Sequence, residues 1–165
     1  MTPATTTEPT PGWQLAQSNV ARMRWPLDDP RMAGFTERLD HLNALAEASP
    51  GFVWRYETPD DDTTEAEVFG EGTLFNLSVW ASVAALEAYV YRSDHLEAVR
   101  RRGDWFARAT QPPLVLWWVR AGARPTVHEA RERFECLWRD GPTAAAFNFR
   151  QRFPAPADAA RVTAC

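Results

Sequence analysis

The polar residues best placed to do chemistry lie on one short segment, Leu74–Trp80 (LFNLSVW), which has the pattern of a β-strand. Alternation along a strand places Asn76, Ser78 and Trp80 on one face. The amide and the hydroxyl could orient a substrate carbonyl and stabilise charge that develops on its oxygen, with the indole as a wall or hydrogen-bond donor. The alternative is a structural amide that hydrogen-bonds a loop, and both interpretations stay open here.

His95 is the histidine that falls on an apolar helical face, close in angle to Leu96 and Val99. A neutral imidazole in an apolar pocket suits proton transfer to or from a phenol or an enol. The other interpretation is a histidine near a helix start that makes one backbone hydrogen bond. Tyr91 lies one turn earlier and could shape the same pocket. Arg102 lies two turns later, where it could bind an anionic group or form an ion pair.

Further candidates for a small-molecule site come from other predicted strands. Gln17 and Asn19 share a face of the first strand and could line the same cleft, although solvation of an edge strand explains them as well. Trp54 and Trp118 could line a pocket, or pack in the core or at a subunit interface. Trp117 and Trp118 are adjacent, so at most one of them faces any single pocket.

Composition excludes several classes of function. All 18 basic residues are Arg, and the absence of Lys removes Schiff-base lysines, pyridoxal-phosphate anchoring and the P-loop lysine. A net charge of -4 gives nucleic acid or an anionic membrane no electrostatic attraction. The three histidines are dispersed, so we expect no metal site. Cys136 and Cys165 form no recognisable disulfide framework, and with no signal-peptide or membrane-spanning pattern they favour a cytoplasmic protein.

The order of the predicted elements defines one domain. Apolar periodicity and punctuation by Pro, Gly and capping residues predict four strands at 13–24, 52–56, 74–80 and 114–119, and helices at 30–49, 82–90, 94–109 and 127–139. This is the β-α-β, β-α-β order of a ferredoxin-like split βαβ fold, an α+β class with an antiparallel sheet, followed by an extra C-terminal helix. We expect the domain to span 13–153, with tails at 1–12 and 154–165. The acidic stretch 59–72 is predicted to be a solvated loop, and the apolar strand 114–119 to be central.

The predicted sheet carries bulky apolar residues on both faces, but two helices can cover only one of them. The most economical partner for the other face is the same face of a second copy. We therefore expect a homodimer built sheet on sheet. The helix 127–139 could cap the cleft or extend across the dimer.

The run LFNLSVWASVAALEAYVYRSDHLEAV, a strand ending in Trp, a short capped helix and then Ser-x-His, resembles the dimeric α+β barrel superfamily, which includes the antibiotic-biosynthesis monooxygenases. The runs WQLAQSNVAR, DDPR, SPGFVWR, NLSVW, YRSDH and LWWV look more closely like an uncharacterised bacterial family within it, over about residues 13–153. The resemblance implies a small-molecule site between sheet and helices. Cofactor-free quinone-forming members carry Asn and Trp four residues apart on a strand, as Asn76 and Trp80 are. Haem-degrading members use a first-strand Asn, a strand Trp and a helix His, which Asn19, Trp80 and His95 match, with the His about one turn early.

Two main hypotheses follow. The first is a homodimeric enzyme that acts on an aromatic or polyketide-like metabolite without a tightly bound cofactor; Asn76 positions an oxygen, His95 is the acid or base, and Trp80 and Tyr91 shape the pocket. Oxygenation, isomerisation and cyclisation all remain open. The second is a non-catalytic dimer that binds a small molecule or haem. A third interpretation assigns all the aromatic residues to packing.

Overall fold

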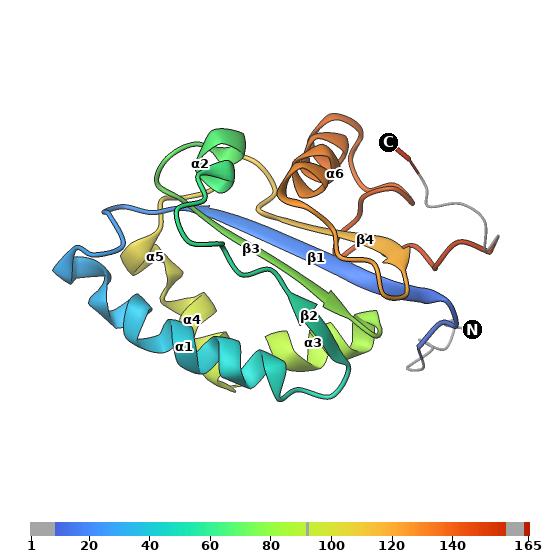
Figure 1. The fold of residues 1–165 in the computed structure, drawn as a ribbon, viewed down its shortest axis with the longest axis horizontal. Coiled ribbons are helices and arrows are strands. Elements are labelled where there is room, and N and C mark those ends of the chain that lie inside the picture. The colour runs from blue at the N-terminus through green and yellow to red at the C-terminus, as the bar shows by residue number, and fades with distance from the viewer. Residues whose placement is uncertain (1–8, 92, 158–163) are drawn as a thin grey trace.

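The computed structural model describes residues 9–91, 93–157 and 164–165, and its centre is one antiparallel sheet (Figure 1). The sheet has the strand order β2-β3-β1-β4. The strands are β1 (Trp13–Arg22), β2 (Phe52–Arg55), β3 (Thr73–Trp80) and β4 (Leu114–Arg120). The helices are α1 (Ala33–Glu47), preceded by a 3-10 turn at Pro30–Met32, then α2 (Thr64–Phe69), α3 (Val83–Val90), α4 (Ser93–Arg100), α5 (Arg102–Trp105) and α6 (Val127–Asp140). The predicted α+β ferredoxin-like fold with an additional C-terminal helix is confirmed.

The elements form three layers. Helices α1, α3, α4 and α5 lie on one side of the sheet, which we call the α1 face, and α2 and α6 lie on the other, the α6 face (Figure 1). Side-chain caps start α3 and α6, and the first of them, Ser82, was predicted from the sequence. The Ser82 hydroxyl accepts a hydrogen bond from the backbone N–H of Ala85, and the Thr126 hydroxyl accepts one from that of Glu129, both at 3.1 Å.

The α1 face is apolar at both ends. At the end where β1 begins, one buried cluster packs the strands against α1, α3 and the segment around residue 147; its members include Leu15, Trp80, Leu86, Trp118 and Phe147. At the other end, a second cluster packs around the start of α1 and α5; it consists of Met32, Phe35, Trp105 and Phe106. The middle of the face carries the polar residues, and the two clusters fix the helices on either side of them.

The α6 face is closed by the chain itself. Phe134 and Leu137 of α6 pack with Leu77, Val79 and Trp117 of the sheet in one buried cluster. The prediction that this face needs a second copy to cover it is therefore wrong for the described residues, because α6 and α2 take that place. The homodimer itself stays a prediction, and it needs another surface.

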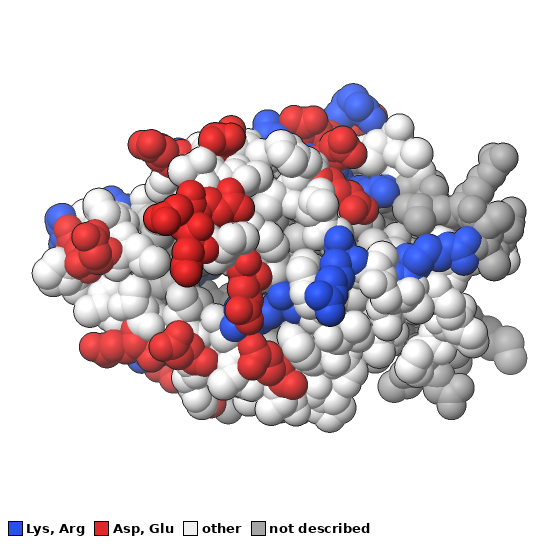
Figure 2. Space-filling view, viewed as in Figure 1, with Lys and Arg blue, Asp and Glu red and all other residues white. Residues whose placement is uncertain are grey.

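Part of the acidic stretch 59–72 is helix α2 rather than loop. Glu65 and Glu67 lie in its first turn, where the helix dipole favours negative charge. Its apolar side chains close over the sheet, since the ring of Phe69 stacks on Phe75 with centroids 5.1 Å apart. Acidic side chains gather on the surface over α2 and the loop before it, so the prediction of a solvated segment holds for its charged residues (Figure 2).

Two further expectations about the elements need correction. Strand β4 is at an edge of the sheet, not in its centre; it is nevertheless buried because α6 and the segment around Phe147 cover it. The helical stretch predicted at 94–109 is divided into α4 and α5, and extended backbone follows at Phe106.

Cys136 and Cys165 are joined in a disulfide with their Cα atoms 5.8 Å apart, contrary to expectation. The cysteines are 29 residues apart in sequence and only the fold brings them together. Of the predicted tails, residues 1–8 and 158–163 lie outside the described residues, while Ala155, in the predicted C-terminal tail, packs against the core cluster around Trp118.

Among the helices that the structure describes, none combines the length and the apolar character required to cross a membrane.

Candidate functional site

The predicted polar residues of β1 and β3 lie opposite one another on the α1 face. In the antiparallel register Asn19 pairs with Asn76 and Gln17 pairs with Ser78. Trp80 follows at the end of β3 on the same face. We call these five residues the polar row. The prediction that they share one face of the sheet agrees with the register.

Side-chain hydrogen bonds link the polar row along its length. The indole Nε1 of Trp80 donates to the Ser78 hydroxyl at 2.9 Å. The amide of Gln17 lies 3.4 Å from that hydroxyl, and also 3.0 Å from the amide oxygen of Asn19 and 3.4 Å from that of Asn76. If the Gln17 amide is turned over, its oxygen instead accepts from the backbone N–H groups of Ser18 and Asn19.

The polar row differs in exposure from one end to the other. Gln17, Ser78 and Trp80 are buried, whereas Asn19 and Asn76 are half-buried. The two asparagines are thus the members that solvent or a ligand can reach. Each amide has donor and acceptor capacity beyond the contacts described, which suits it to hold a carbonyl or hydroxyl oxygen.

Contacts between aromatic rings connect Trp80 to His95. The ring of Tyr89 in α3 stacks on Trp80 with centroids 5.2 Å apart, and its other neighbour is the His95 imidazole at 4.9 Å. The Tyr89 hydroxyl donates to the carbonyl oxygen of Leu42 in α1 at 3.1 Å. Burial raises the pKa of Tyr89 to about 12, so the phenol stays neutral at ordinary pH.

The surroundings of His95 fix its tautomer. Nδ1 lies 3.0 Å from the carbonyl oxygen of Val90, which can only accept, so Nδ1 carries the proton. Nε2 is then left with a lone pair, as a general base requires. Burial lowers the pKa of His95, partly offset by the bond to Val90, and this keeps the neutral form dominant near pH 7.

Three residues expected at the site lie elsewhere. Tyr91 is 58% exposed beyond the end of α3, because the helix stops before it; Tyr89 takes the position that was assigned to Tyr91. Trp54 packs into the α6-face cluster, because a register irregularity between Phe52 and Trp54 turns it away from the polar row. Arg102 lies at the exposed start of α5 and lines a cavity at the end of β1.

Trp118 is on the predicted face but has a packing role. It is 8% exposed, and its indole nitrogen donates to the carbonyl oxygen of Phe153 at 2.9 Å. Trp117 points to the opposite face, because consecutive residues of a strand alternate. Its indole nitrogen donates to the carboxylate of Glu129 in α6 at 3.1 Å. Both indoles tie the edge strand to segments that follow it in the sequence.

Sequence reasoning missed Tyr89 as a site residue. The available signal was its spacing of three residues from Leu86 on the apolar face of α3, which places it over the sheet.

The residues matched to haem-degrading enzymes do not form a haem site. Tyr89 is packed against both Trp80 and His95, so its ring fills the space where a macrocycle would need to contact them. Within the described ranges, no group of three or more His, Cys, Asp or Glu side chains could hold a metal ion.

The fold and the polar row define an α+β ferredoxin-like protein with a polar strip between two apolar clusters. Residues 14–163 match the family described as domain of unknown function DUF3291, and the chain belongs to that family. The expected membership of an uncharacterised family is thereby confirmed. No curated protein matches the chain.

Several solved structures overlap part of the chain. The NE2512 protein of unknown function from Nitrosomonas europaea is 16% identical over 70% of this chain and 95% of its own, with a TM-score of 0.44. SnoaB, a cofactor-independent oxygenase from Streptomyces nogalater, is 15% identical over 68% and 95%, with a TM-score of 0.43. A dabb family protein with a ferredoxin-like fold from Mesorhizobium loti is 12% identical over 68% and 98%, with a TM-score of 0.38. Overlaps of this extent carry no information on activity.

Proposed function

We propose that this protein is a small-molecule enzyme that moves a proton on an aromatic, polyketide-like substrate without a tightly bound cofactor. The observation that supports this is the polar row itself, a hydrogen-bonded strip in the middle of a sheet face whose two ends are apolar. A strip with a purely structural role could be replaced by aliphatic side chains like those around it. Two half-buried asparagines and a neutral histidine are the groups that acid–base chemistry at an enol requires.

The proposal gives the polar row the substrate oxygen and His95 the proton. Asn76, with Asn19 opposite, donates an amide N–H to the substrate carbonyl and stabilises the enolate oxygen. His95 accepts the proton at Nε2, and Trp80, Tyr89 and the Ser78–Gln17 bonds hold the aromatic wall and the amides in place. Trp80 is buried, so the substrate reaches the two asparagines and does not contact Trp80 itself.

The proposal is tested with dithranol, a three-ring hydroxylated anthrone whose ring CH₂ is acidic. Removal of one CH₂ proton gives the enolate, and return of a deuteron from D₂O completes an exchange that NMR follows without oxygen or any other co-reactant. We expect the protein to accelerate this exchange under anaerobic conditions. The variants Asn76→Ala and His95→Asn should each lower the enzymatic rate by about 100-fold or more, as loss of an oxyanion donor or a general base does.

His128→Asn is the matched control, because His128 is exposed on α6, away from the α1 face. It should exchange dithranol at the rate of the unchanged protein. Full exchange activity in folded Asn76→Ala and His95→Asn proteins contradicts the proposal. Tight binding of dithranol with no accelerated exchange favours the second candidate, a non-catalytic small-molecule binder.

A further inference from the structure

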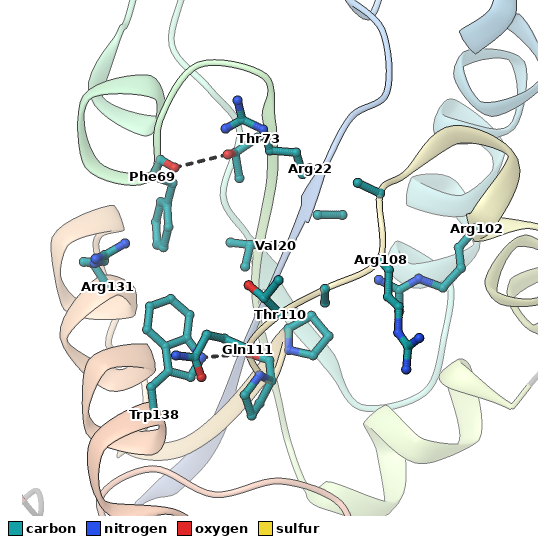
Figure 3. Close-up of a pocket in the computed structure, with 15 residues that line it drawn as sticks. Val20, Arg22, Phe69, Thr73, Arg102, Arg108, Thr110, Gln111, Arg131 and Trp138 are labelled. Atoms are coloured by element: carbon teal, nitrogen blue, oxygen red, sulfur yellow. Dashed lines mark hydrogen bonds between the residues drawn. The ribbon is translucent and has the colours of Figure 1, made fainter.

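A cavity of about 330 Å³ lies where β1 runs past the end of β4 (Figure 3). It is bounded by segment 107–113 and by side chains from α2, α5 and α6. None of the five residues of the polar row lines it. Its volume is at the lower end of the range for small-molecule sites, which suits a ligand of one or two rings.

The lining of this cavity is strongly basic in a chain whose net charge is -4. Arg22, Arg102, Arg108 and Arg131 all line it, and none of its 15 lining residues is acidic. Among the described residues, the side chains of Arg22, Arg102 and Arg108 make no ion pair and no hydrogen bond. All three side chains are exposed, and their charge makes the potential at the cavity positive.

One wall of the cavity is aromatic and held in place. The indole nitrogen of Trp138 donates to the carbonyl oxygen of Pro112 at 2.9 Å. The guanidinium of Arg131 lies 5.3 Å from the Trp138 ring centroid and 5.7 Å from that of Phe69, while it also pairs with Glu135 at 2.8 Å. This wall offers a flat apolar surface next to a cation.

The arginines that line the cavity lie on both sides of segment 107–113. In Figure 3, Phe69, Arg131 and Trp138 lie on one side of segment 107–113, and Arg102 and Arg108 lie on the other. Arg22 lies near the aromatic wall. Its guanidinium is 3.8 Å from the point where a Cβ on Gly70 would lie, and Gly70 directly follows Phe69. Arg22 can therefore meet an anionic group while a ring lies against Phe69.

We propose that this cavity binds a small aromatic carboxylate, with the ring against Trp138 and Phe69 and the carboxylate on Arg22. A guanidinium matches a carboxylate with two parallel N–H···O bonds, and Arg102 and Arg108 add positive potential from the far side. The site is separate from the polar row and does not depend on the proton-transfer function proposed for it.

The test uses 2-naphthoate as the probe and isothermal titration calorimetry at low ionic strength. We expect saturable binding that weakens as salt is added. Arg22→Gln and Trp138→Leu should each weaken it by about tenfold or more, the usual effect of losing a charged hydrogen bond or a stacking surface. Arg150→Gln is the matched control, because Arg150 is exposed and does not line the cavity; it should bind like the unchanged protein.

Two further ligands separate the contributions of charge and ring. Naphthalene-2-carboxamide keeps the rings and loses the charge, and inorganic phosphate keeps a charge and loses the rings, so both should bind at least about tenfold more weakly than naphthoate. Equal binding of the carboxamide, equal binding by folded Arg22→Gln, or no heat at about 1 mM naphthoate overturns the proposal. Dithranol exchange by Arg22→Gln should stay at the rate of the unchanged protein, so failure of this site and failure of the proton-transfer proposal are distinguishable.

Discussion

Tyr89 joins the strand and helix parts of the candidate site. Its ring contacts Trp80 and His95, and its hydroxyl donates to Leu42 in α1. One side chain therefore links β3, α3, α4 and α1, and its protonation state affects all these contacts.

Tyr89 should make stability depend on alkaline pH. Its pKa is raised by burial from 10.0 to about 12, so the folded state favours the neutral phenol. The stabilisation that this preference gives is complete below about pH 10. It is lost as the pH rises through the pKa of Tyr89 in the folded state, because the unfolded chain releases the Tyr89 proton first. Tyr89→Phe should cost about 0.5–1.5 kcal/mol at pH 7 through the lost hydrogen bond, and its free energy of unfolding should then fall less steeply between about pH 10 and 12.

The measurement is urea unfolding of Tyr89→Phe and of Tyr91→Phe at several pH values. Tyr91 is 58% exposed and serves as the control, which should follow the unchanged protein. The same alkaline slope in Tyr89→Phe and the unchanged protein would show that Tyr89 does not titrate as described.

At the scale of residues, strand alternation predicted which side chains share a face better than helix periodicity did. The period of two placed Gln17, Asn19 and Asn76 on one face because the register of β1 and β3 is regular. It failed for Trp54, since the irregularity in β2 reverses the faces. Counting at 3.6 residues per turn failed for Tyr91, because α3 ends before it.

At the scale of elements, the contact between β2 and α3 depends on a glycine. Gly51 has φ +83°, and a Cβ added there would lie 2.5 Å from the Cβ of Ala85 in α3. Its carbonyl accepts from the backbone N–H of Ala81 at 2.7 Å, which ties the turn before β2 to the end of β3. Any side chain larger than that of Gly51 would therefore push β2 away from α3.

Gly51→Ala should therefore destabilise the fold more than Gly72→Ala does. Gly72 also has a positive φ, +77°, but nothing lies within 4 Å of the added Cβ. The left-handed backbone alone costs about 1–2 kcal/mol, so we expect that loss for Gly72→Ala and about 1–3 kcal/mol more for Gly51→Ala. Thermal and urea unfolding of both variants measure the difference, and equal losses would mean that the close approach to Ala85 costs nothing.

Periodicity and caps predicted the order of the long elements. They did not predict the short helices. Helix α2 is six residues long and lies in an acidic stretch, so its two apolar side chains, Val68 and Phe69, gave no helical period. The apolar sequence of β4 led to the prediction that it is a central strand of the sheet. That inference failed because a helix and a later segment can bury an edge strand as completely as neighbouring strands can.

At the scale of the whole molecule, α6 substitutes for the second subunit that the sequence suggested. Both faces of the sheet are apolar, as predicted, but the sequence could not say whether the cover is a second copy or a segment of the same chain. Helices α2 and α6 bury the apolar residues of the α6 face, so we expect this face not to need a second copy. A homodimer stays a prediction, and one formed through this face would first have to displace α6.

Substitution of Phe134 tests how much the stability of the fold depends on α6. It is completely buried against the sheet, and Phe134→Ala should cost about 3–5 kcal/mol, because it leaves a cavity in the largest cluster. Leu27→Ala, at a side chain that is 40% exposed, should change the free energy of unfolding by less than about 0.5 kcal/mol. Urea unfolding at two protein concentrations gives both values. A small loss for Phe134→Ala would contradict this role of α6, whereas a midpoint that rises with concentration would show that association through some surface contributes to stability.

The bridge between Leu116 and Phe147 has a consequence for how this sheet can grow. Two backbone hydrogen bonds of 2.8 Å occupy part of the outer edge of β4, whereas β2 is the other edge strand of the sheet. A sheet with one blocked side can accept a further strand on the other side only. Pairing of β2 with β2 of a second molecule would use up the open edge of both, so assembly through strands would end at two molecules and could not extend into a fibre.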